Sequence, residues 1–122
     1  MVLSCSYGNV DQPLKPDTTM YNYPWIAFQA WISTDDKESG SAHRQVTGQD
    51  DPGEAVITAP WPYMARTTWG DASRIGHSSW MGDIERFKST YFSHFNQPVF
   101  FQGDVAVSYP DGSFSLHGRS DD

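Results

Sequence analysis

The stretch Gly82–Phe95, GDIERFKSTYFSHF, decides the fold, because it carries the one clear helical pattern of the sequence. Its apolar residues recur at helical spacing and form one stripe: Ile84, Phe87, Tyr91, Phe92 and Phe95. Asp83 can cap the first turn, and Asn96 with Pro98 signals the end of the helix. So much aromatic surface needs a sheet to cover it.

The composition indicates that this sheet makes up most of the protein. The sequence has seven Phe, six Tyr and five Trp, against three Leu, five Ile and seven Val. Aromatic and β-branched residues suit a pleated, half-buried surface, and the abundant Asp, Ser, Gly and Pro suit turns. The clearest strand patterns are Pro24–Ile32, His43–Thr47, Glu54–Ala59, Val99–Tyr109 and Ser113–His117.

Short connections predict how these strands pair. The first three are expected to follow one another as a meander. The sequence PDG at 110–112 is typical of a three-residue hairpin turn, so the last two strands should pair, with Phe114 and Leu116 facing the core. Gln102 and Gly103 indicate a bulge or bend in the first strand of that hairpin.

We therefore predict an α+β fold that is mostly β: an antiparallel sheet or flattened barrel of short strands, with one amphipathic helix at about 82–95 packed on one face. Residues 1–23 are expected to form an extended N-terminal arm, residues 24–118 a single globular domain, and residues 119–122 a loose acidic tail.

The charge of the chain limits its partners. The formal net charge is −7, from 15 acidic and 8 basic residues, and nucleic acids and anionic membranes attract basic surfaces instead. Cys5 is the single cysteine, and no apolar run is long enough to cross a membrane. We expect no nucleic-acid or membrane partner, and a location inside the cell or within a larger particle.

The sequence contains no motif with catalytic or metal-binding spacing. The acidic turns lie far apart in a meander, and the four histidines lack the spacing of zinc ligands. An acid–base pair needs only two groups, so His77 with Asp71, or Asp83 with His94, stays open. Apart from these two possible pairs, we predict no catalytic residue, no metal and no cofactor.

Aromatic residues crowd a stretch with weak secondary-structure signals between residues 60 and 80. Tryptophan, tyrosine and arginine anchor many protein interfaces, and aromatic rings also stack on ring-shaped ligands. The same tryptophans are also suited to filling a core that is poor in leucine. The predicted binding residues are Trp61, Tyr63, Arg66, Trp69, Arg74 and His77.

These patterns favour a non-catalytic structural or interaction module, as a repeated, self-associating subunit of a larger assembly such as a virion, tail or filament. Two alternatives remain from the sequence. One is a module that binds a carbohydrate or another small ring-shaped molecule on an aromatic platform. The other is a small β-barrel enzyme that uses a His/Asp pair in an aromatic pocket.

Overall fold

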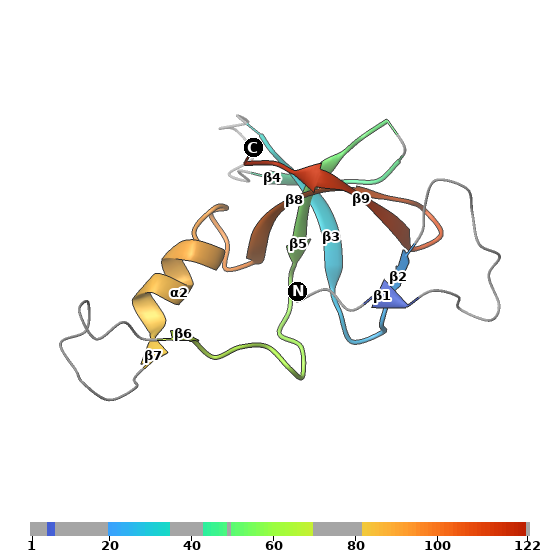
Figure 1. The fold of residues 1–122 in the computed structure, drawn as a ribbon. Helices are drawn as coiled ribbons and strands as arrows, with labels where there is room; N and C mark the ends of the chain where they lie inside the picture. Colours follow the sequence, from blue (N-terminus) through green and yellow to red (C-terminus); the bar gives the residue numbers. More distant parts are fainter. Residues whose placement is uncertain (1–4, 7–19, 35–42, 49, 70–81, 122) are drawn as a thin grey trace.

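A computed structural model describes residues 5–6, 20–34, 43–48, 50–69 and 82–121 of the chain. Among these residues, seven strands form one antiparallel sheet, which curls as a half-barrel, and one helix lies beside it (Figure 1). The predicted fold class, mostly β with a single amphipathic helix, is confirmed.

The sheet has the strand order β1-β2-β9-β8-β5-β3-β4. Its strands are β1 (Cys5–Ser6), β2 (Met20–Asn22), β3 (Phe28–Ser33), β4 (His43–Val46), β5 (Gly53–Ile57), β8 (Phe100–Ser108) and β9 (Ser113–Arg119). A second, two-stranded ladder pairs β6 (Thr68–Trp69) with β7 (Gly82–Asp83).

The predicted meander is wrong, because β5 pairs with β3 and not with β4. The composition of the strands explains the order. In β4 only Val46 is buried, whereas four of the five residues of β5 are buried. A polar strand suits the edge of a sheet and an apolar strand suits its middle, so β3 and β5 take central places and β4 lies outside them.

The hairpin of β8 and β9 forms at the predicted turn. Gly112 has a φ of 85°, which is the left-handed conformation that the turn requires, and the Gly112 amide donates to the Tyr109 carbonyl at 3.0 Å. The predicted facing of β9 holds for Phe114 but not for Leu116, which is 36% exposed, while Ser115 is buried. The pairing of β8 with β9 shifts register between Val105 and Ala106, and this shift breaks the simple alternation.

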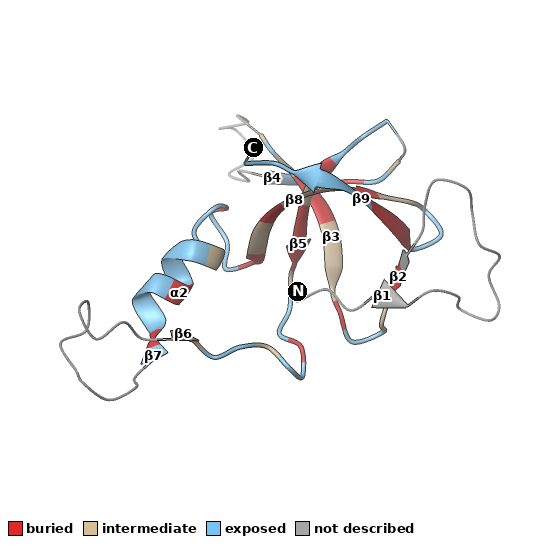
Figure 2. Ribbon diagram, viewed as in Figure 1, coloured by how far each residue is buried: buried red, intermediate tan, exposed pale blue. Residues whose placement is uncertain are grey.

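The helix α2 is shorter than predicted and spans Ile84–Tyr91. Asp83 caps it as expected, since its Oδ1 accepts from the Arg86 amide at 3.0 Å. Gly82 and Asp83 themselves belong to β7, and Phe92, at φ −128°, leaves the helical conformation. Figure 2 shows α2 largely exposed, and Phe87 is its buried residue.

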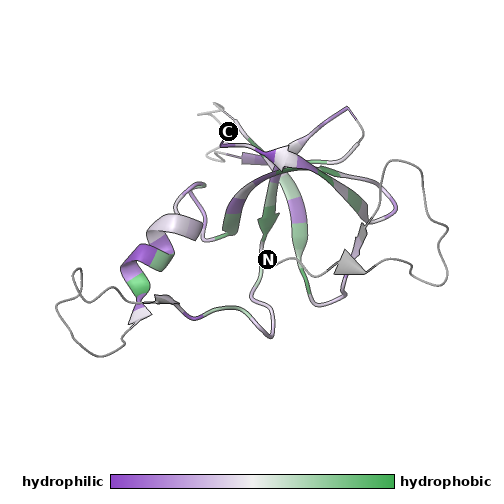
Figure 3. Cartoon of the chain, viewed as in Figure 1, coloured by the Kyte–Doolittle hydropathy of each residue, from purple (hydrophilic) through white to green (hydrophobic). Residues whose placement is uncertain are grey.

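The core lies on both faces of the β5–β8 pair. One cluster contains Ile26, Ile57, Trp61 and Phe100, and a second contains Trp31, Val56, Phe95 and Val99. Successive side chains of a strand point to opposite faces, so Val56 and Ile57 each serve one cluster. Figure 3 shows this apolar character concentrated on the central strands of the sheet, with a largely hydrophilic helix.

The predicted apolar stripe is therefore divided. Tyr91 and Phe92 pack against the first cluster, whereas Phe95 belongs to the second. Ile84, at the start of the stripe, is 46% exposed. The segment between α2 and β8 thus passes from one face of the sheet to the other, which a continuous helix to residue 95 would prevent.

No helix among the described residues is long and apolar enough to cross a membrane. The division into arm, domain and tail stays a prediction. The sheet does contain parts of all three, because β2 comes from the predicted arm and β9 ends at Arg119 in the predicted tail.

Candidate functional site

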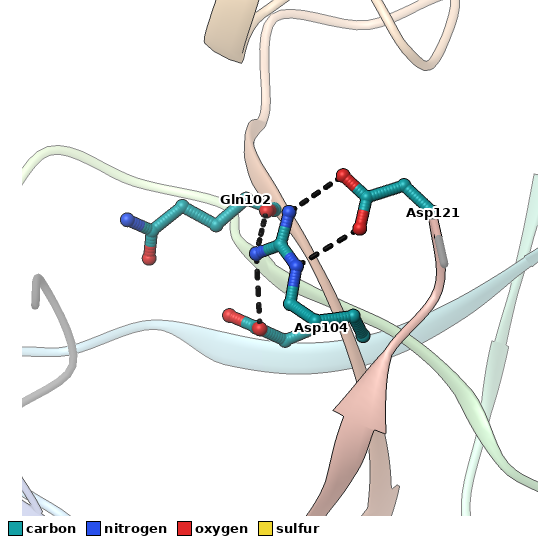
Figure 4. A network of polar contacts seen from close by, with 4 residues as sticks. Gln102, Asp104 and Asp121 are labelled. Atoms are coloured by element: carbon teal, nitrogen blue, oxygen red, sulfur yellow. Dashed lines mark hydrogen bonds and ion pairs between the residues drawn. The ribbon is translucent and has the colours of Figure 1, made fainter.

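A charged cluster lies where the end of β9 meets the middle of β8. Figure 4 shows the Arg119 side chain between Asp104, Asp121 and the backbone carbonyl of Gln102. Arg119 Nη1 donates to the Gln102 carbonyl at 2.6 Å and to Asp104 Oδ1 at 3.2 Å. Its Nε and Nη2 donate to the two oxygens of Asp121 at 2.9 and 2.6 Å. The guanidinium is thus fixed on two sides, with a bidentate carboxylate on one of them.

Gly103 makes this geometry possible. Its φ of +81° is a left-handed conformation that favours glycine. A Cβ at this position would lie 2.8 Å from Arg119 Nη2 and 3.2 Å from Asp121 Oδ2. A side chain at residue 103 would therefore displace the guanidinium, so the bend predicted from Gln102 and Gly103 has a structural purpose here.

The cluster carries more negative than positive charge. The hydrogen bond from Arg119 holds the pKa of the Asp121 carboxyl below its usual range, and the same bond raises the pKa of Arg119. One guanidinium faces two carboxylates, so the formal charge of the three side chains is −1. Such a cluster suits hydroxyl donors better than it suits phosphate groups.

A cavity of about 230 Å³ lies next to this cluster, on the α2 side of β8. Its lining residues come from the segment before β6, from β6, from α2 and from β8: Trp61, Tyr63, Ala65, Thr67, Thr68, Phe87, Tyr91, Phe100 and Gln102. Gln102 joins the two features, since its backbone carbonyl accepts from Arg119 while the residue also lines the cavity.

Aromatic contacts shape the walls of this cavity. Phe100 stacks on Tyr91 with ring centroids 5.2 Å apart and meets Trp61 edge to face at 5.2 Å. Phe87 meets Tyr91 edge to face at 5.5 Å. Offset and edge-to-face pairs of this kind are favourable and stiff, so the cavity has defined walls.

The structure brings only part of the predicted binding site together. Trp61 and Tyr63 line the cavity, with Trp61 buried and Tyr63 49% exposed. Arg66 is exposed, and the backbone of Trp69 ends β6. Arg74 and His77 lie outside the described residues, as does the pair His77 with Asp71. The set as a binding site stays a prediction.

The other predicted acid–base pair has different roles in the structure. Asp83 is buried as the cap of α2. The His94 ring stacks on Phe101 with centroids 3.8 Å apart. Among the described residues, no three His, Cys, Asp or Glu side chains gather where they could hold a metal ion. The expectation of no metal and no cofactor stays a prediction.

The sequence analysis missed the charged cluster altogether. Asp104 and Arg119 are 15 positions apart and meet only because β8 and β9 pair. Two signals could have pointed to them. A hairpin continued two residues past the predicted end at His117 brings Asp104 opposite Arg119, and the glycine before Asp104 marks a place where another group approaches the backbone closely.

Comparison with known proteins relates the chain to enzymes. No family model matches it. The chain is 40% identical over 110 residues to a protein of Deinococcus radiodurans named acetyl-coenzyme A synthetase. The matched stretch is 90% of this chain and 14% of that protein. It is 41% identical over 70 residues to a protein of the same name from Streptomyces avermitilis, and 37% identical over 73 residues to one from Wolinella succinogenes. Each of these two matches covers 57% of this chain and 9% of the relative. The chain therefore spans 9% to 14% of the length of these three proteins.

The predicted function is therefore wrong. A structural or interaction subunit of a virion, tail or filament does not fit a chain that shares about 40% of its residues with enzymes along most of its length. The two alternative predictions are wrong for the same reason. Neither a binding module nor a small β-barrel enzyme with a His/Asp pair is the class of protein that the comparison indicates. The sequence reasoning treated the missing catalytic motifs as a sign of no catalysis, but a short part of a long enzyme need not contain them.

Proposed function

We propose that this chain is a segment of an enzyme that forms acetyl-coenzyme A, or derives from such a segment. The observation that carries this proposal is the 40% identity over 110 residues to the enzyme of Deinococcus radiodurans. Since the chain spans 14% of that protein, the reaction needs residues outside this chain. An intracellular location, predicted from the sequence, is part of the same proposal.

Within such an enzyme, the Arg119 cluster is the part of this chain that meets a substrate. It lies on two inner strands of the sheet, at the C-terminal end of β9, with the Arg119 side chain 43% and the Asp104 side chain 26% exposed. Arg119 already binds one oxygen of Asp104, so it holds that carboxylate in a fixed orientation. An oriented carboxylate accepts hydrogen bonds from hydroxyl groups. A ribose that bears no phosphate on its 2′ and 3′ oxygens offers hydroxyl groups of this kind.

A segment exchange tests the proposal. The part of the Deinococcus radiodurans enzyme that aligns with this chain would be replaced by the chain, and the formation of acetyl-coenzyme A would be measured with the substrates and conditions of the parent enzyme. The same enzyme with the aligned part deleted gives the baseline. We expect the exchanged enzyme to form the product well above this baseline. An exchanged enzyme that folds, by circular dichroism and melting, and yet stays at the baseline contradicts the proposal.

A further inference from the structure

An open groove of about 640 Å³ lies along α2, and we call it the α2 groove. It shares only Phe87 with the smaller cavity described above. Its apolar lining residues are Ile84, Phe87, Phe92 and Pro98, and Ile84 is 46% exposed. A contiguous apolar surface that water reaches marks a place where another molecule, or another part of a chain, packs.

The shape of the α2 groove suits a stretch of polypeptide. Five of its lining residues recur at the spacing of one helical face: Glu85, Lys88, Ser89, Phe92 and Ser93. The helix has eight residues, so this face extends over about 12 Å. Sites for small molecules bury most of the surface of their ligand, whereas an open groove along a helix receives a second helix or an extended segment.

Two opposite charges lie at the α2 groove. Glu85 and Lys88 both line it and are exposed, and neither has an ion-pair partner among the described residues. Their charges cancel, so the α2 groove carries no net charge that would select an anion or a cation. A complementary occupant is apolar at its centre, with a basic side chain near Glu85 and an acidic side chain near Lys88.

The comparison with known proteins indicates where such an occupant comes from. Because 110 of the 122 residues match the protein of Deinococcus radiodurans, residues 84–98 lie inside the match. The match is only 14% of that protein, so most of its chain lies outside and is available to pack on this face. A second copy of this chain is a poorer occupant, because each copy has a net charge of −7 and the copies repel each other.

We propose that the α2 groove is the face on which this segment docks against the rest of the enzyme. The occupant is a stretch of the enzyme outside the matched part, with an apolar centre between one basic and one acidic side chain. The docking face rests on the proposed function, since it needs the chain to be a segment of a larger enzyme. The α2 groove is then open in the free chain and covered in the enzyme.

Cysteine labelling compares the free chain with the exchanged enzyme of the segment exchange. Ser89→Cys places a thiol in the α2 groove, and Thr90→Cys places one on the same helix outside it, both at exposed positions. The rate of alkylation by N-ethylmaleimide is read from the labelled peptide by mass spectrometry. We expect the rate for Ser89→Cys to be at least about tenfold lower in the exchanged enzyme than in the free chain, and the rate for Thr90→Cys to differ by less than about threefold.

A second substitution links this protection to the apolar contact. Ile84→Ser removes the exposed apolar side chain from the α2 groove and should weaken docking, whereas the free chain, checked by circular dichroism, should stay folded. In the exchanged enzyme, Ile84→Ser combined with Ser89→Cys should react at least about fivefold faster than Ser89→Cys alone. In the free chain the two rates should be equal.

The outcomes separate the docking face from the proposed function, because labelling needs no catalysis. A folded exchanged enzyme that is inactive but protects Ser89→Cys contradicts the formation of acetyl-coenzyme A and supports the docking face. An active one in which Ser89→Cys and Thr90→Cys react equally fast overturns the docking face alone. Protection of Ser89→Cys that grows with the concentration of the free chain assigns the α2 groove to a second copy and also overturns it. An exchanged enzyme that does not fold overturns both.

Discussion

The β8–β9 hairpin and the α2 flank, by which we mean residues 61–69 together with α2, are built in different ways. The hairpin is held by backbone pairing from Ser108 opposite Phe114 to Asp104 opposite Arg119, with one register shift between Val105 and Ala106. The α2 flank has only the two-residue ladder of β6 and β7, and it rests on ring contacts such as Trp61 with Phe100. Backbone pairing fixes the charged cluster, whereas the cavity is shaped mainly by side-chain packing, with Thr68 of the short ladder in its wall.

This difference teaches where the molecule should tolerate change. Damage to the hairpin core should unfold the sheet, because β8 joins β9 to β5 in the middle of it. Damage to the flank should stay local, because few of its residues reach the sheet. The predictions below test this contrast from the largest expected effect to the smallest.

The largest effect should follow from Phe114→Ala in the hairpin. Phe114 is fully buried and packs on Phe28 with ring centroids 4.4 Å apart. Its loss leaves a large cavity between β9 and β3, so we expect the free energy of unfolding to fall by about 3–5 kcal/mol. Urea denaturation followed by tryptophan fluorescence measures it. A loss under about 1 kcal/mol would mean that the hairpin does not hold the core.

A smaller effect is expected from Phe87→Ala in the α2 flank. Phe87 is the buried residue of α2, and its ring contacts Tyr91 and Phe92 from the helix itself. We expect a loss of about 2–3 kcal/mol that is concentrated in faster hydrogen exchange of the α2 amides. The control Ser89→Ala should change stability by less than about 0.5 kcal/mol. Equal exchange of the α2 and β8 amides in Phe87→Ala would remove the contrast between the two regions.

Removing the helix cap should lower the stability of the fold less than Phe87→Ala does. Asp83 accepts from the Arg86 amide, and such a cap contributes about 1 kcal/mol. Asp83→Ala should therefore lower the melting temperature by a few degrees, whereas Asp83→Asn, which keeps an acceptor oxygen, should lower it less. If both variants melt at the same temperature as the parent chain, the cap contributes nothing measurable.

The smallest effect on stability should come from pH at the charged cluster. Arg119 holds the pKa of Asp121 below its usual range, so this carboxylate stabilises the fold above its unfolded pKa. The contribution is lost as the pH falls through the lowered folded pKa, and it is small because the pair is exposed. Carboxyl titration by nuclear magnetic resonance should show the Asp121 midpoint rising in Arg119→Ala. An unchanged midpoint would mean that the bidentate pair does not persist in solution.

The sequence predicted the hairpin better than the α2 flank, for a physical reason. The turn at 110–112 and the glycine at 103 act through local backbone conformation, which is visible in a few residues. The course of the chain after Tyr91 depends on which face of the sheet receives Phe95, and helical spacing does not contain that information. The predicted strand order was wrong for a similar reason. Whether β5 pairs with β4 or with the more distant β3 depends on tertiary packing, which local sequence patterns do not contain.

The candidate site was predictable only in its aromatic part. Trp61 and Tyr63 stand out in the sequence because they lie in a stretch with weak secondary-structure signals, and because tryptophan and tyrosine anchor many binding sites. Asp104 and Arg119 are common residues whose meaning comes from pairing across the hairpin. The prediction of the function failed for a further reason: the chain matches only 14% of the length of the Deinococcus radiodurans protein, and so short a stretch presents few of the residues that define a long enzyme's chemistry.

The central claim is that the charged cluster serves the formation of acetyl-coenzyme A, and Asp104→Asn in the exchanged enzyme tests it most directly. The variant keeps the shape of the side chain and removes its charge, so the fold should persist, whereas one strong hydrogen-bond acceptor is lost. We predict a fall in the rate of acetyl-coenzyme A formation of at least about tenfold, with the matched change Asp51→Asn in an exposed turn leaving the rate within about twofold. Equal rates for the two variants, both folded, would contradict the claim.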